Sequence, residues 1–254
     1  MRLLHFNSSG NGFSLTEFVN EIPQYGILSH TWGPDSDEVT YKELVEGTGS
    51  GKAGYRKLKF CGDQAKKDQL QYFWVDTCCI DKSSAVELQE AITSMFRWYS
   101  EAAKCYVYLA DVSTEGFDPA GSVELWEPAF RGSRWFTRGW TLQELIAPLS
   151  VEFFSADCRL LGDKKSLRRH IHEITGIPYP ALEGSPLSGF SVADRMSWAE
   201  KRVTKREEDK AYSLLGIFGV YIPLIYGEGA NAFRRLRKEI FADDCKCNPT
   251  IQSC

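Results

Sequence analysis

Short apolar runs alternate with amphipathic segments between residues 25 and 158, and this alternation restricts the fold more than any other feature. Helical spacing of apolar residues predicts helices over 53–69 and from Ser84 onward, where Ser84 and Glu87 have the spacing of a capping box. The apolar runs predict buried strands at 25–30, 72–75, 105–109 and 151–154. Strands that alternate with helices are typical of a parallel sheet covered by helices on both faces. The sequence therefore predicts an α/β fold.

The pattern changes after the fourth predicted strand, where helical segments replace the alternation. Thr204 and Glu207 have the spacing of a second capping box, and the apolar residues that follow predict one helix to Phe218. We therefore expect an α/β unit over residues 1–160 and a mostly helical C-terminal extension over residues 161–254.

Composition excludes several classes of protein. The chain has 254 residues, 25% of them charged and 43% hydrophobic, as in a packed globular protein. The formal net charge of -4 and the lack of a long basic run argue against nucleic acid as a partner. No apolar stretch approaches the ~20 residues that span a bilayer, and the first residues do not resemble a secretory signal. We expect a cytoplasmic protein without a membrane span.

The sequence contains no metal-binding or phosphate-binding motif of standard spacing. Its 8 cysteines include no C-x-x-C pair, and no histidine follows the C-terminal cysteines at zinc-ligand spacing. Residues 47–52 resemble a phosphate loop, but Glu46 and Ala53 stand where that motif needs glycine and a hydroxyl residue. We expect no metal site and no cofactor, and cysteines that mostly fill the core.

Polar residues gather at the predicted strand ends, where ligands bind in sheets of this type. The densest groups are Ser29–Gly33, Asp76–Asp81 and the helical segment Arg138–Leu145. On that helix Trp140 and Glu144 are four residues apart and share a face. A carboxylate beside an indole in a cleft has a raised pKa and interacts strongly with a developing cation. The same pattern also fits an exposed glutamate above a half-buried tryptophan, which is the commoner arrangement.

Three segments resemble the signature blocks of a known family. Ile27–Gly33 (ILSHTWG), Tyr72–Asp81 (YFWVDTCCID) and Arg138–Leu145 (RGWTLQEL) are similar to the blocks of the HET domain, the heterokaryon incompatibility domain of filamentous fungi. Residues 206–218 and 224–229 resemble the segment that follows them. The resemblance implies a role in self/non-self recognition and programmed cell death, with an NLR-type or other incompatibility protein as partner.

A more distant resemblance bears on chemistry. Trp140–Leu145 is similar to the W-C-L-x-E-L helix of TIR domains, whose flavodoxin-like sheet and helices match the predicted alternation. The resemblance implies that Glu144 is the catalytic residue of NAD⁺ cleavage and stabilises the positive charge on the ribose as nicotinamide leaves. Taken together with the polar residues at the neighbouring strand ends, the resemblance implies a set of substrate-binding residues. They are Ser29, His30, Trp32, Asp76, Arg138 and Trp140. Thr141 departs from TIR domains, which have cysteine there, and residues 160–254 have no TIR counterpart.

Three hypotheses follow. The first is a HET effector of cell death that consumes NAD⁺ as substrate and self-associates to complete its site. The second is a noncatalytic death-signalling module that acts through self-assembly and partner binding. The third is a thiol hydrolase that uses Cys78 or Cys79 with His30. We also expect the acidic loop at 113–128 to be a mobile cover beside Glu144.

Overall fold

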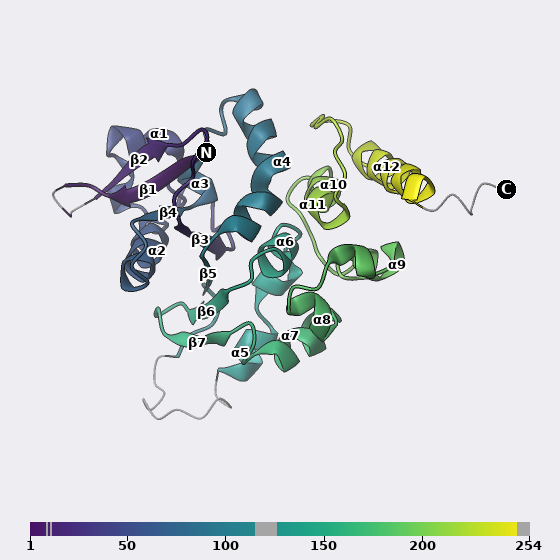
Figure 1. The fold of residues 1–254 in the computed structure, drawn as a ribbon. Helices are drawn as coiled ribbons and strands as arrows, with labels where there is room; N and C mark the ends of the chain where they lie inside the picture. The colour runs from purple at the N-terminus through teal and green to yellow at the C-terminus, as the bar shows by residue number, and fades with distance from the viewer. Residues whose placement is uncertain (9, 11, 115–125, 248–254) are drawn as a thin grey trace.

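A mixed sheet forms the centre of the protein in this computed structural model, which describes residues 1–8, 10, 12–114 and 126–247 (Figure 1). In the described residues its strand order is β2-β1-β4-β3-β5-β6-β7. The strands are β1 Arg2–Phe6, β2 Phe13–Glu17, β3 Tyr25–His30, β4 Tyr72–Trp74, β5 Lys104–Leu109, β6 Val151–Ser155 and β7 Leu160–Asp163. The central strands β4, β3, β5 and β6 are parallel, and β1, β2 and β7 join the edges antiparallel. The α/β prediction is confirmed.

The three edge strands were not predicted from the sequence. In β2 every residue but the last is half-buried, and in β7 none is fully buried. Such strands lack the continuous apolar run that marks a strand buried on both faces. Pairing between these edge strands and the parallel strands turns the predicted parallel sheet into a mixed one.

Helices cover both faces of the sheet, with α2 on one side and α4 and α6 on the other (Figure 1). The chain runs from β3 to β4 on one side and then crosses back to β5 on the other side of β3. In open α/β sheets, the crevice at such a reversal is where ligands bind. The helices of this part are α1 Tyr41–Glu46, η1 Gly49–Gly51, α2 Tyr55–Lys67, α3 Asp76–Cys79, α4 Ala85–Glu101, α5 Glu127–Arg131, η2 Arg134–Thr137 and α6 Thr141–Ile146.

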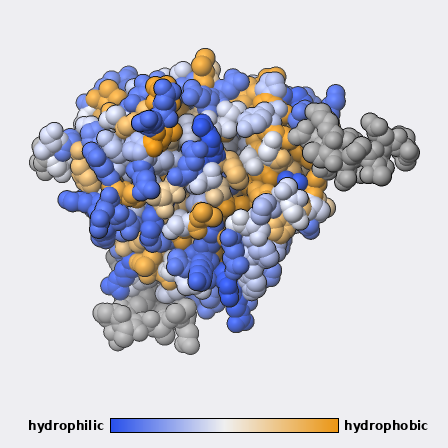
Figure 2. All heavy atoms as spheres, in the orientation of Figure 1, coloured by the Kyte–Doolittle hydropathy of each residue, from blue (hydrophilic) through white to orange (hydrophobic). Residues whose placement is uncertain are grey.

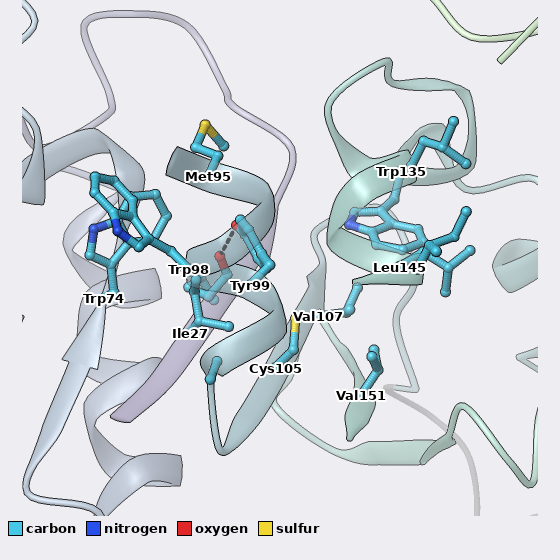
Figure 3. Close-up of a cluster of buried hydrophobic side chains, with 14 of the residues drawn as sticks. Ile27, Trp74, Met95, Trp98, Tyr99, Cys105, Val107, Trp135, Leu145 and Val151 are labelled. Atoms are coloured by element: carbon cyan, nitrogen blue, oxygen red, sulfur yellow. Dashed lines mark hydrogen bonds between the residues drawn. The ribbon is translucent and has the colours of Figure 1, made fainter. Parts of the chain in front are cut away.

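Alternation along the strands decides which side chains meet each helix layer. On β3, the Tyr25 hydroxyl donates a hydrogen bond to the Trp98 carbonyl of α4, at 2.5 Å. Two residues along from Ile27, Ser29 points to the same side and reaches α6. Figure 3 shows Trp98 of α4 and Trp135 of η2 gathered with apolar side chains from β3, β5 and β6. This core holds the helix that carries Glu144 against the end of β3.

The helices after β7 lie on the side of α4 and α6 (Figure 1). They are α7 Arg168–Thr175, α8 Tyr179–Leu182, η3 Leu187–Gly189, α9 Val192–Ser197, α10 Asp209–Tyr212, α11 Leu215–Phe218 and α12 Asn231–Cys247. Of these, α11 contacts α4, α8 contacts α6, and the longer α12 packs on α10. The helices α11 and α4 approach closely, because a Cβ on Gly216 would lie 2.1 Å from the Cβ of Phe96. The predicted helical character of this part is therefore confirmed.

The predicted helix from Thr204 to Phe218 is wrong. Thr204 Oγ1 donates to the Arg206 carbonyl instead of capping a helix, and two short helices, α10 and α11, replace the long one. The reason is tertiary, because Val203 pairs with the backbone around Arg138. This pairing keeps the chain extended up to Thr204, so the helix begins only at Asp209.

The described helices include none that is both long and apolar enough to cross a membrane. Figure 2 shows hydrophilic and hydrophobic residues interspersed over the visible face. Most of the loop predicted to be a mobile cover, residues 115–125, lies outside the described residues.

Candidate functional site

A cavity of about 220 Å³ opens at the carboxyl ends of β3 and β4. One wall consists of the segments after these strands, and another of apolar side chains from α4. The third consists of Arg138, Trp140, α6 and residues that follow α9. The predicted residues His30, Trp32, Asp76, Arg138, Trp140 and Glu144 all line it. Residues of both the α/β unit and the helical extension therefore line this cavity.

Glu144 is held at the base of this cavity by a short chain of hydrogen bonds. Its Oε2 accepts a hydrogen bond of 2.5 Å from Ser29 Oγ, and Ser29 Oγ accepts one of 2.8 Å from the Trp135 indole. Ser29 and Trp135 are fully buried, so neither can turn toward water. The second carboxyl oxygen, Oε1, accepts no hydrogen bond from the described residues and is available to a ligand.

Burial gives Glu144 an unusual titration. Glu144 is only 6% exposed, so the alternative prediction of an exposed surface glutamate is wrong. The pKa of Glu144 is raised to about 8, chiefly by burial and also by the negative charge of Asp76. The Ser29 hydrogen bond and the positive charges of Arg202 and Arg138 work in the opposite direction. Glu144 therefore exchanges its proton near neutral pH.

Asp76 lies on the other side of the cavity and stays ionised. Its Oδ1 is 3.0 Å from His30 Nε2, and its Oδ2 is 3.5 Å from Lys82 Nζ. Burial favours the neutral acid, but Lys82 and His30 outweigh it and hold the pKa of Asp76 below its usual range. The Lys82 ammonium also lies 3.7 Å from the centre of the Trp32 ring. These contacts hold the negative charge of Asp76 and the exposed indole of Trp32 at the cavity.

Ser29 is the one predicted substrate-binding residue that does not line the cavity. It lies behind Glu144, and its hydroxyl is used by Glu144 and Trp135. The alternation of β3 explains this position, because Ser29 points toward α6 while the next residue, His30, is at the strand end. Its geometry is that of a positioning residue.

The extension supplies a buried guanidinium that sequence reasoning missed. Arg202 Nη1 donates to the Arg138 carbonyl at 2.9 Å and to Thr141 Oγ1 at 2.8 Å, and its Nε donates to the Trp198 carbonyl. Burial lowers the pKa of Arg202 to about 9, so the group keeps its charge at neutral pH. Arg202 thus ties the start of α6 to the extension and places a positive charge near Glu144.

Four further residues of the extension line the cavity, and none was predicted there. They are Lys205, Arg206, Asp209 and Tyr226. The Tyr226 hydroxyl donates to Asp209 Oδ1 at 2.9 Å, and Arg206 lies 4.4 Å from the centre of the Tyr226 ring. Burial raises the pKa of Asp209. The similarity of residues 206–218 and 224–229 to the HET family was the only signal in the sequence for Arg206, Asp209 and Tyr226, and Lys205 had none.

The cysteines next to this site are core residues. Cys78 and Cys79 are buried, and burial raises the pKa of the Cys78 thiol well above its ordinary value. The Cys79 sulfur accepts a hydrogen bond from the Val75 amide, whereas His30 pairs with Asp76. A nucleophilic thiol needs a nearby base and a lowered pKa, so this geometry argues against the thiol hydrolase. Within the described ranges, no group of three or more acidic, histidine or cysteine residues could hold a metal ion.

Comparison with known proteins agrees with the motifs that meet at this cavity. The model of the heterokaryon incompatibility protein (HET) family matches residues 25–127. Vegetative incompatibility protein HET-E-1 of Podospora anserina is 59% identical over 246 residues, which are 96% of this chain but only 18% of that relative. The chain thus spans less than a fifth of the length of this relative. No solved structure matches the chain. The chain belongs to the heterokaryon incompatibility (HET) family.

Proposed function

We propose that this chain is an effector of fungal vegetative incompatibility and that it acts by cleaving NAD⁺ at the bond between nicotinamide and ribose. The support for the biological role is the similarity to HET-E-1, a vegetative incompatibility protein. The single observation that carries the reaction is the buried Glu144, fixed by Ser29 at the base of a cavity that the family motifs line. The TIR-like helix Trp140–Leu145 supports the same assignment.

The chemistry of this bond requires little more than such a carboxylate. When the bond between ribose C1′ and the nicotinamide nitrogen breaks, its electron pair goes to the nitrogen, and nicotinamide leaves as a neutral molecule. The positive charge passes to the ribose, where a nearby carboxylate stabilises it. Water then adds to C1′ and releases a proton, so the products are nicotinamide, ADP-ribose and H⁺. No acid is needed for the leaving group, which agrees with one central glutamate.

The high pKa of Glu144 suits a cationic substrate. In the free protein the Glu144 carboxyl is largely protonated at neutral pH, because its pKa is about 8. The pyridinium charge of NAD⁺ beside it favours the ionised form and lowers that pKa. Substrate binding therefore creates the charge that the transition state needs, and the Ser29 hydroxyl already donates to the oxygen that becomes negative.

The side chains around the cavity opening suit a substrate that has both aromatic rings and charged groups. Trp32 and Trp140 offer aromatic faces, and Arg138 and Asp76 offer opposite charges, around the same opening. In this proposal His30, Trp32, Asp76, Arg138 and Trp140 contact the substrate, and Ser29 acts through Glu144. We expect the protein to act in the cytoplasm and its activity to increase when it self-associates. Another incompatibility protein would be the activating partner.

Nicotinamide release from NAD⁺ by the concentrated purified protein tests the proposal. We expect release by the wild type and by Glu90→Gln, a control on the exposed face of α4, and at least hundredfold slower release by Glu144→Gln. Intact NAD⁺ with oligomeric wild-type protein that still kills cells would favour the noncatalytic module that acts through assembly. Equal release by wild type and Glu144→Gln would remove Glu144 from the reaction.

A further inference from the structure

Two arginines face the cavity without a protein acceptor. Arg138 and Arg206 both line it, and in the described part of the chain neither guanidinium has a hydrogen bond or an ion pair to another residue. The two lysines at the cavity differ in this respect, because Lys82 pairs with Asp76 and Lys205 with Asp35. The spare positive charge of the cavity therefore belongs to the two arginines.

Backbone pairing brings together the two segments that carry these arginines, which are distant in the sequence. Val203 donates its amide hydrogen to the Thr137 carbonyl at 2.7 Å, and Gly139 donates to the Val203 carbonyl at 2.9 Å. Arg138 thus lies opposite Val203 in a short parallel bridge. Val203 precedes Arg206 by three residues in the sequence. Gly139 allows this close approach, because a Cβ there would lie 2.4 Å from Thr204 Cγ2. Main-chain contacts therefore hold the segment of Arg138 against the segment that leads to Arg206.

The guanidinium of Arg206 is held by its neighbours, and the backbone of Arg138 is held by the extension. Arg206 lies over the Tyr226 ring, whose hydroxyl is held by Asp209. Arg138 is half-buried, and its carbonyl is held by the buried Arg202. The planar guanidinium matches two oxygens of a phosphate group better than a lysine ammonium does. Two such groups at one opening match two adjacent phosphates.

The geometry points to a diphosphate clamp formed by Arg138 and Arg206 at the mouth of the Glu144 cavity. Its ligand class is a nucleotide in which a diphosphate links the reacting ribose to a second nucleoside. This inference rests on the proposed function for the reaction at Glu144, but the clamp itself is a binding site and can be tested without any cleavage. The extension then contributes to substrate selection, since Arg206 lies in it.

Calorimetric titration with ADP-ribose, and with adenosine as a probe that lacks phosphates, tests the clamp. We expect Arg138→Gln and Arg206→Gln each to weaken ADP-ribose binding by about tenfold to hundredfold, and adenosine binding by less than about twofold. Arg206→Lys should retain part of the affinity. Arg237→Gln, an exposed control on α12 outside the cavity, should bind ADP-ribose like the wild type.

Two results would overturn the clamp. One is ADP-ribose binding that neither arginine substitution weakens, and the other is an equal loss of ADP-ribose and adenosine binding, which would mean a damaged fold. Failure of the proposed function is a separate outcome. If the arginine variants lose ADP-ribose while the wild type leaves NAD⁺ intact, the clamp stands and the cleavage reaction does not.

Discussion

At the scale of single residues, the burial of Glu144 makes the stability of the fold depend on pH. In the unfolded chain a glutamate has a pKa of 4.5, and in the fold Glu144 has a pKa of about 8. Between these two values the folded protein holds a proton that the unfolded chain has lost. The free energy of unfolding therefore falls as pH rises through this window, and the contribution of the protonated carboxyl is lost above pH 8.

Glu144→Gln should consequently stabilise the protein as pH rises. The amide can accept the Ser29 hydrogen bond and never ionises, so the gain in melting temperature over the wild type should grow between about pH 5 and pH 8. Thermal unfolding across this range measures it, with Glu90→Gln as the control. A gain that is independent of pH would contradict the raised pKa.

Ser29→Ala should show whether Ser29 acts on the reaction through its hydrogen bond to Glu144. Loss of the hydroxyl removes the hydrogen bond that favours ionised Glu144, so the pH dependence of nicotinamide release should move to higher pH. The Trp135 indole would also lose its acceptor, which should destabilise the fold by roughly 1–3 kcal/mol. Ser188→Ala, an exposed serine, is the control. An unchanged pH profile in Ser29→Ala would show that the serine does not act on Glu144.

At the scale of elements, the contact between α11 and α4 joins the extension to the α/β unit. Gly216→Ala would place a methyl group 2.1 Å from the Phe96 Cβ, and the two helices would have to separate. We expect a loss of about 1–3 kcal/mol of unfolding free energy and reduced activity, because α4 also lines the cavity. Gly189→Ala, where the added methyl group meets open space, should leave stability unchanged to within ~0.5 kcal/mol. Equal stability of the two variants in urea unfolding would refute this account of the contact.

The central elements could be predicted because their patterns are local. β3, β5 and β6 are continuous apolar runs, and Ser84 accepts a hydrogen bond from the Glu87 amide at the start of α4. The Glu87 side chain, however, accepts from the Asp81 amide, so the predicted capping box forms only in part. What the sequence could not reveal depends on partners distant in the chain. The edge strands, the extended segment at Val203 and the role of Ser29 are all decided by tertiary contacts.

At the scale of the whole molecule, the cavity depends on both parts of the chain. The site residues that the sequence predicted in the α/β unit line the same cavity as Arg206 and Asp209 of the extension. No local sequence pattern indicates that these two residues lie there. The bridge between Arg138 and Val203 and the buried Arg202 connect the two parts further. We expect residues 1–160 and the extension to unfold together in a single calorimetric transition. Two separate transitions would contradict this dependence.

The pH dependence of kcat/KM for nicotinamide release from NAD⁺ tests the central claim most directly, since kcat/KM reports the ionisation of the free enzyme. If ionised Glu144 performs the reaction, kcat/KM should rise about tenfold per pH unit and level off above pH 8, and Glu144→Gln should lack this rise. A wild-type profile that is flat between about pH 6 and pH 9, or one that Glu144→Gln reproduces, would contradict the account.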